Sequence, residues 1–580
     1  MRSLLKFILL ILFYNLVIFQ FLPAGKAGFN LEIQAQTMKK AFINGKIYTV
    51  SEKQPYAEAV VIEGNKIKYV GSENGAQKFI TPETEVIDLE GKLMLPGFND
   101  SHLHFLSGGH YLLGINLRPA LSKIEFVNII KDYIEVRSPD SFRLNGTTPR
   151  SGDWVTGGRW DHELWKDKTL PTKDLIDSIT QNIPVFVSRI DGHVGLANSK
   201  ALELARINKN TPDPEGGLIE RNPETGEPTG ILKDNAMDLV FKVIPDYTVE
   251  ENIEAVSRAL DEARRYGITS VQDMTQPEEF DAYLSVNEQG KLSCRINAIW
   301  KIDQYEDIVR SGVTVGKEEG LIKRGALKGY ADGSLGASTA WFFDPYVQDP
   351  RTSGLPMDIV TNGKLEQWAF DADRNRLQLC IHAIGDRANN YILNLFERVK
   401  SQNSPWERRF RIEHAQHLKR DDIYRFSKIG VIASVQPYHC IDDGVWAEKR
   451  IGKERIQTTH AYKSLLENNT ILAFGTDWPV APLNPLYGIY AAVTRRTLDG
   501  KNPDGWVPEE KISVEDAIKC YTLNSAYASF EENLKGSIEV GKLADFVVLS
   551  DDILIIDPVK IKDVKVKMTV FDGEIVYERE

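Results

Sequence analysis

Two histidines one residue apart, His102 and His104, are the first residues in this sequence whose types and spacing suit chemistry. They end a mostly apolar run over 95–104. On a β-strand, residues two positions apart project from the same face, so this pair aims both imidazoles at one point. Two neutral nitrogens at one point suit a divalent metal ion. A single pair among ten histidines is weak evidence, and its weight depends on the residues further along the chain.

More histidines and a carboxylate come at the ends of other strand-like apolar runs. His382 ends the run over 377–382, His414 ends the run over 411–414, and Asp477 ends the run over 471–477. Taken singly, each is more often a hydrogen-bonded core residue or a turn residue. Their ordered recurrence at strand ends instead favours a metal centre with positions left open for water and substrate. These ligand types allow zinc, iron or manganese.

The elements that must position these residues show a βαβ pattern, in which apolar runs alternate with helical stretches such as 248–266. A (β/α)8 TIM-type barrel, an α/β fold, would bring all the strand ends to one face. A doubly wound open sheet is the competing layout, but no glycine-rich phosphate turn comes after the first strand. The run over 295–300 is also strand-like and leaves a ninth strand open. We expect the eight barrel strands at 94–104, 184–193, 268–273, 326–332, 377–382, 411–414, 431–436 and 471–477.

Short strand-like segments separated by turn residues occur at both ends of the chain. They cover 41–50 and 59–67 near the start, and 544–549 and 570–577 near the end. Asn-Gly and Gly-Asn pairs between the early segments indicate tight turns. We therefore expect a small β-sandwich built from both chain ends, residues 38–94 and 531–580, with the barrel over 95–530.

The N-terminus has the order of an export signal. Arg2 and Lys6 precede an apolar run over 7–22 and a short stretch rich in small residues over 23–27. The sequence predicts a signal peptide over 1–27 and an exported protein, periplasmic or secreted. The alternatives are a membrane anchor formed by the uncleaved run, and a cytoplasmic form that starts at Met38.

Composition narrows the class of partner. The net charge of −12 and the pI near 5.5 argue against a general nucleic-acid binder, because no basic excess exists to neutralise phosphates. The four cysteines are widely spaced, so neither a zinc knuckle nor a redox motif is indicated. We expect a small-molecule substrate, no nucleic acid and no membrane contact beyond the N-terminal signal or anchor. A homodimer is left open.

Further motifs make the chain resemble the amidohydrolase superfamily, and within it the YtcJ-like branch, amidohydrolase family 3. The resemblance covers residues 39–580. It implies a metal-bearing barrel with a β-sandwich made from both chain ends. Its motifs are Gly-Gly-Arg-Trp-Asp at 157–161, Arg-Ile-Asp-Gly-His at 189–193, Asn-Ser-Lys-Ala-Leu at 198–202, Ala-Asp-Gly-Ser-Leu-Gly at 331–336 and Gly-Ser-Ile-Glu-Val-Gly-Lys-Leu-Ala-Asp at 536–545.

The resemblance gives Lys328 a specific role. In binuclear relatives a fourth-strand lysine carries CO₂ as a carbamate and bridges two metal ions, and Lys328 precedes His382 in that order. An ordinary lysine paired with Asp332 is the alternative, and the site would then hold one metal ion. The expected cofactor is a divalent metal such as zinc, one or two per chain, with a carbamylated Lys328 in the binuclear case. The expected ligands are His102, His104, Lys328, His382, His414 and Asp477.

The expected chemistry is hydrolysis without a covalent nucleophile. A divalent metal lowers the pKa of bound water to about 7 and polarises a carbonyl, and Asp477 is assigned as the proton shuttle to the leaving nitrogen. We expect cleavage of a non-peptide carbon–nitrogen bond in an amide, N-formyl or N-acyl compound. The alternatives are deamination of a cyclic amidine with a single metal ion, and a barrel that binds without catalysis. Candidate substrate-binding residues are Trp160, Asp161, Arg189, His193, Asp332 and Trp478. For Asp161, Arg189, His193 and Trp478 a structural role is equally open.

Overall fold

The computed structural model describes residues 38–136, 154–180, 182–189, 192, 194–214, 217–313, 315 and 320–580. The predicted signal peptide and His193 lie outside these residues. Among the described residues, no helix combines the length and the apolar composition needed to cross a bilayer.

Eight parallel strands form the central sheet. The backbone after the last of them returns to the first, since Asp477 donates its N–H to the carbonyl of His102 at 2.7 Å. The predicted (β/α)8 barrel is confirmed. Its strands, in spatial order, are β8 (Phe98–Leu103), β15 (Ile268–Met274), β16 (Arg295–Lys301), β17 (Ile322–Tyr330), β18 (Gln378–Ala383), β19 (Arg411–His414), β20 (Ile432–Val435) and β21 (Leu472–Phe474).

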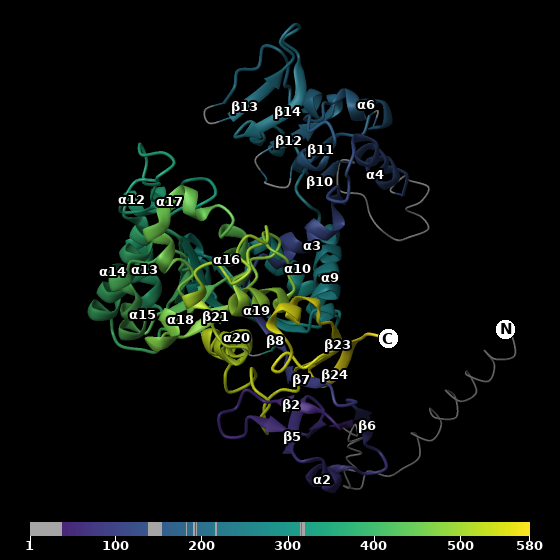
Figure 1. Cartoon of the computed structure of the whole chain (residues 1–580), viewed down its shortest axis with the longest axis vertical. Coiled ribbons are helices and arrows are strands. Elements are labelled where there is room, and N and C mark those ends of the chain that lie inside the picture. Colours follow the sequence, from purple (N-terminus) through teal and green to yellow (C-terminus); the bar gives the residue numbers. More distant parts are fainter. Residues whose placement is uncertain are drawn as a thin grey trace, which may run out of the picture. The chain divides into compact units, whose positions relative to one another are not determined.

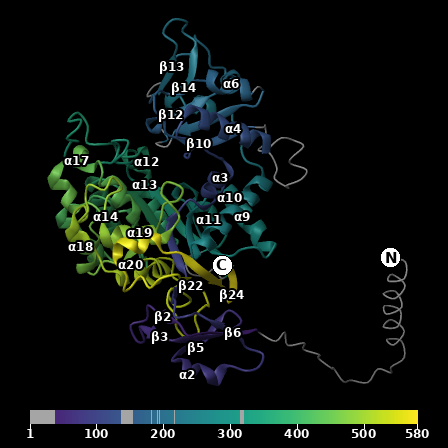
Figure 2. The same cartoon turned by 45° about the vertical axis from the view of Figure 1, so that its right-hand side comes forward.

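Helices on the outside of the barrel bury one apolar stripe each against the strands. In α9 (Val249–Arg265), Thr248 and Glu251 form a capping box, and Val256, Ala259 and Leu260 lie on the buried side. Figures 1 and 2 show the other helices of this layer around the strands. They include α10 (Pro277–Glu288), α13 (Lys364–Arg374), α14 (Asp386–Gln402), α15 (Ile423–Ile429), α18 (Tyr462–Glu467) and α20 (Val514–Cys520).

A separate six-stranded sheet is inserted between β8 and α9, and it corrects one predicted barrel strand. The run expected at 184–193 is β11 (Val185–Arg189) of this sheet, whereas β16, left open as a ninth strand, lies in the barrel. Both runs are short and largely buried, so periodicity cannot tell which sheet each one joins. The inserted sheet has the order β13 (Gly217–Arg221), β14 (Pro228–Asp234), β12 (Val194–Ala197), β11, β10 (Val155–Trp160) and β9 (Ile115–Asn116).

The two chain ends together form the predicted β-sandwich. One sheet has the order β5 (Lys66–Gly71), β4 (Ala59–Glu63), β1 (Lys39–Ile43), β6 (Glu85–Asp88). The other has the order β24 (Glu574–Glu578), β23 (Val566–Phe571), β22 (Phe546–Leu549), β7 (Leu93–Pro96), β2 (Lys46–Tyr48), β3 (Tyr56–Ala57). Figure 1 shows the early strands in purple beside the late ones in yellow. Phe42, Val60, Met94 and Phe546 belong to the core of this sandwich.

Candidate metal centre

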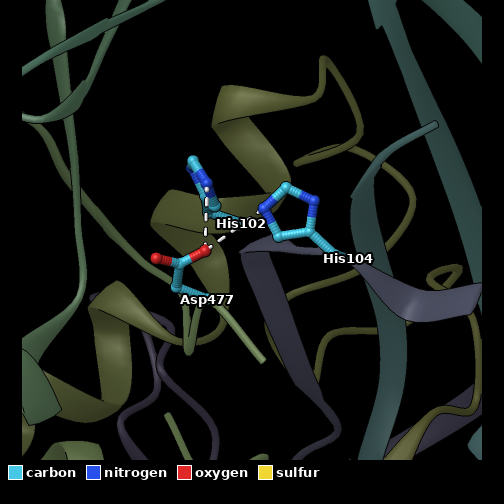
Figure 3. A group of neighbouring side chains, drawn as sticks. All are labelled: His102, His104 and Asp477. Atoms are coloured by element: carbon cyan, nitrogen blue, oxygen red, sulfur yellow. Dashed lines mark ion pairs between the residues drawn. The ribbon is translucent and has the colours of Figure 1, made fainter. Parts of the chain in front are cut away.

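The His-x-His pair and Asp477 meet at the carboxyl end of the barrel strands. His102 lies on β8, His104 comes just after that strand, and Asp477 comes after β21. One ligand atom of each residue lies within 4.8 Å of those of the other two. Oδ1 of Asp477 is 3.6 Å from Nε2 of His102 and 3.4 Å from Nε2 of His104. Figure 3 marks both contacts with dashed lines. The fold thus makes neighbours of residues 375 positions apart.

Glu413 and Arg411 lie under this group and are functional candidates that the sequence reasoning missed. Oε2 of Glu413 is 2.5 Å from Nδ1 of His102, and both side chains are buried. Arg411 donates from Nε to Oε1 of Glu413 at 2.8 Å. Burial opposes ionisation of Glu413, but Arg411 and the hydrogen bond to His102 outweigh it and hold its pKa well below the usual range. The sequence feature that could have identified Glu413 is its position beside His414 at a strand end.

His414 joins the same group through an unusual backbone turn. The ring centroids of His102 and His414 are 4.8 Å apart. Side chains alternate along β19, so His414 would point away from the interior that Glu413 occupies. Its φ of 72° and the φ of 42° at Ala415 turn the chain at the strand end. This left-handed backbone costs energy for a non-glycine residue and is typical of functional sites.

His382 on β18 completes the row of imidazoles. Its ring centroid is 4.5 Å from that of His414. Its Nε2 lies 3.1 Å from the carbonyl oxygen of Gly333, to which it donates. Nδ1 is therefore the ring atom of His382 that is left for a metal ion.

Lys328 lies on β17 beside β18 and points its charge into this group. Glu413 and Asp477 act electrostatically on Lys328, and its own charge contributes to lowering the pKa of His102. Burial lowers the pKa of Lys328 to about 8. A substantial fraction of its amine is therefore uncharged at mildly alkaline pH, the form that reacts with CO₂.

Among the described residues, no ion pair joins Asp332 to Lys328; Oδ1 of Asp332 instead lies 3.6 Å from Nε2 of His382. Its carboxylate accepts hydrogen bonds from the backbone N–H groups of Ile384 at 3.0 Å, Gly385 at 2.8 Å and Trp341 at 2.8 Å. The side chain is fully buried. Asp332 thus organises the loops after β17 and β18, and its contact with substrate stays a prediction.

Two tryptophans expected to contact substrate are packed as core residues in this structure, and their contact with substrate stays a prediction. Trp160 is fully buried in the inserted sheet, where its Nε1 donates to the carbonyl of Val187 at 3.0 Å. Trp478 packs edge-on against Phe105, and a Cβ on Gly108 would lie 2.0 Å from its ring. Both side chains are large and apolar, and the sequence alone does not separate packing in the core from contact with a ligand.

Asp161 and Arg189 lie on the inserted sheet rather than on barrel strands. Asp161 comes after β10, and Arg189 ends β11; both are partly buried. Their contact with substrate stays a prediction, as does that of His193.

Hydrogen bonds keep Asp477 ionised. Burial alone would raise its pKa, but hydrogen bonds from His104 and His439 hold that pKa well below the usual range. Nε2 of His439, on α16 (Pro437–Asp443), is 3.2 Å from Oδ2 of Asp477. One carboxylate oxygen thus faces the His-x-His pair and the other faces His439, a residue that the sequence reasoning did not place among the candidates.

This donor set fits a divalent metal ion. Burial, with the charge of Lys328, lowers the pKa of His102 to about 4 and that of His382 to about 3. Both rings are consequently neutral at pH 7, the form that binds a metal. Asp477 supplies the anionic oxygen that such a site needs.

Comparison with known proteins decides the family. A family model described as "Amidohydrolase family" matches residues 85–577. The chain belongs to the amidohydrolase family. This membership confirms the predicted resemblance and the expectation of a hydrolase acting on carbon–nitrogen bonds.

Named relatives cover most of this amidohydrolase. It is 38% identical over 520 residues to Protein LONG AFTER FAR-RED 3 of Arabidopsis thaliana, covering 87% of this chain and 86% of the relative. It is 34% identical to the putative amidohydrolase YtcJ of Bacillus subtilis, covering 93% of this chain and all of the relative. The N-substituted formamide deformylase of Arthrobacter pascens is 26% identical, over 93% of this chain and 98% of the relative.

A solved structure agrees with the fold of this amidohydrolase. An uncharacterized metal-dependent hydrolase from Pyrococcus horikoshii superimposes with a TM-score of 0.74 and 29% identity. The match covers 90% of this chain and 99% of that one.

Proposed function

We propose that this amidohydrolase cleaves the amide bond of an N-formyl or N-acyl small molecule with water as the nucleophile. The observation that carries the proposal is the meeting of His102, His104 and Asp477 within 4.8 Å. The similarity to an N-substituted formamide deformylase supports the substrate class.

The residues that would hold metal are the predicted set of six. His102, His104 and Asp477 form the first part, and His382 and His414 continue the row of imidazoles. Lys328 would join as a carbamate, which turns a cation into an anionic two-oxygen ligand suited to bridging two cations. A bound divalent cation supplies Lewis acidity, which acidifies water and polarises the amide carbonyl.

Asp477 performs the proton transfers in this proposal. Its ionised carboxylate accepts one proton from the attacking water as the carbon–oxygen bond forms. It returns that proton to the amide nitrogen as the carbon–nitrogen bond breaks, releasing a carboxylic acid and an amine. His439 holds Oδ2 at 3.2 Å, so Oδ1 stays directed at the His-x-His pair.

A substrate panel with metal analysis tests the proposal. Purified protein is assayed on N-substituted formamides, N-acyl amines, lactams and cyclic amidines, with separate detection of acid, amine and ammonia. We expect acid and amine from the first two classes, and loss of turnover after chelation that metal restores. Ammonia release from cyclic amidines, with one metal ion per chain, would establish the deaminase alternative instead. A full rate after exhaustive chelation would end the metal-dependent proposal.

A further inference from the structure

A cavity lies beside the candidate metal centre, and of the six residues proposed to hold metal only Lys328 lines it. It measures about 530 Å³, within the range of roughly 300–1,000 Å³ that small-molecule sites occupy. We name it the β17 cavity. Its lining includes Ile302 after β16, Lys328 and Tyr330 on β17, Leu355 and Met357 in the loop after β17, and Trp368 on α13.

The β17 cavity adjoins the candidate metal centre. Lys328 and Gly333 line it, and the carbonyl oxygen of Gly333 is 3.1 Å from Nε2 of His382. The Tyr330 ring also lines it, with its centroid 5.4 Å from that of His382 and 5.1 Å from Nζ of Lys328. A molecule with its amide at the metal ligands therefore has this cavity beside it.

The walls of the β17 cavity are suited to an uncharged group. Ile302 is buried and Trp368 partly buried, whereas Leu355 and Met357 leave 62% and 42% of their surfaces accessible. The other charged residues of the lining, Lys301, Asp303 and Asp358, are exposed and of mixed sign. Apolar side chains accessible inside a cavity favour an apolar ligand group, which removes both surfaces from water.

We propose that the β17 cavity binds a hydrocarbon substituent of the substrate, so the enzyme selects amides that carry one bulky aliphatic or aromatic group. The inference rests on the proposed function for the reaction, but the binding of the substituent is argued from the cavity alone.

Two homologous series test the selectivity. N-alkylformamides from methyl to hexyl vary the amine side, and N-methylamides from formyl to hexanoyl vary the acyl side. We expect kcat/KM to rise in one series by about fourfold per added methylene until the cavity is filled. If the methyl members are hydrolysed but kcat/KM is flat in both series, the cavity proposal is overturned while the proposed function stands.

Variants of the cavity wall test whether the β17 cavity causes the dependence of kcat/KM on chain length. Met357→Trp fills the cavity and is expected to abolish the rise with chain length while leaving the rate for the methyl member. The matched control is Val347→Trp, since Val347 is also an exposed apolar residue of the same loop but does not line the cavity. If Met357→Trp lowers the melting temperature, Met357→Asp tests the site with a charge instead. Equal chain-length dependence in folded cavity variants and wild type would overturn the proposal.

A binding measurement tests the cavity proposal independently of the proposed hydrolysis. Calorimetric titration of the Asp477→Asn protein compares N-hexylformamide with N-methylformamide. Even if neither compound is hydrolysed by wild type, tighter binding of the hexyl compound that Met357→Trp removes would support the cavity. Equal affinities for the two compounds would refute it.

Discussion

Oε2 of Glu413 lies 2.5 Å from Nδ1 of His102, and neither side chain is reached by solvent. This contact leaves Nε2 of His102 directed at Asp477. A carboxylate behind a ligating imidazole fixes the orientation of the ring and raises its basicity, so it strengthens metal binding without touching the metal.

Replacing Glu413 by glutamine should weaken metal binding. We expect a loss of about 10- to 100-fold in affinity for Zn²⁺, measured by competition with a chromophoric chelator. The melting temperature should fall too, because Arg411 loses its buried counter-charge. Glu407→Gln, at an exposed carboxylate, is the control. Unchanged metal affinity in a folded Glu413→Gln protein would show that Glu413 serves only the fold.

Replacing Asp477 by asparagine should separate catalysis from metal binding. Asparagine keeps an oxygen that faces His102 and His104 but accepts protons poorly. We expect kcat to fall by about 10²- to 10⁴-fold, with most of the metal retained by elemental analysis. Asp551→Asn in the β-sandwich, an exposed residue, should behave like wild type. Normal turnover in Asp477→Asn would remove the proton-shuttle assignment.

Replacing Gly475 by alanine should disturb the metal centre through the backbone. A Cβ at this position would lie 2.5 Å from the backbone nitrogen of His102. Since β21 and β8 would have to separate, we expect a loss of about 1–3 kcal/mol in the free energy of unfolding, together with weaker metal binding. Gly336→Ala is the control, because its nearest neighbour would be 3.9 Å away. Thermal melts and metal titrations that match between the two variants would contradict this expectation.

Metal loading should depend on bicarbonate and on pH. Burial lowers the pKa of Lys328 to about 8, so about half of its amines are uncharged at pH 8 and only about a tenth at pH 7. Only the uncharged amine forms a carbamate, and reconstitution with bicarbonate should therefore yield more metal per chain at pH 8 than at pH 6.5. The pKa values of about 4 and 3 at His102 and His382 mean that these rings do not take up protons in this interval.

Elemental analysis after reconstitution with and without bicarbonate measures the effect. Lys328→Ala should abolish it, and Lys428→Ala, at an exposed lysine of α15, should not. A metal content that ignores bicarbonate at both pH values would argue for the single-metal alternative.

The meeting of the candidate metal ligands was predictable because the sequence signal of each residue is local. His102 and His104 are spaced for one face of a strand, and His382, His414 and Asp477 each end an apolar run. Parallel strands in a barrel bring such ends together whatever their separation in sequence. The barrel was predictable from the alternation of apolar runs with helical stretches, and the sandwich from the turn-separated strand-like segments at both chain ends.

The remaining features depend on tertiary contacts that leave no local pattern. β11 and β16 were exchanged because strand pairing, rather than composition, assigns a buried strand to its sheet. Glu413 was missed because its role depends on His102, which lies 311 positions away. The left-handed backbone at His414, which turns two adjacent side chains to one interior, has no signature in residue type.

The pairing of β7 with β22 imposes an order of assembly on this protein. β7 runs directly into β8, which carries His102, whereas Phe546 of β22, the partner of Pro96, is synthesised 450 residues later. While the chain is being synthesised, β7, which leads into the strand of His102, therefore lacks its partner strand β22. That edge of β7 stays open until β22 has emerged, so the sandwich closes, and braces the start of β8, only after every barrel strand has been made.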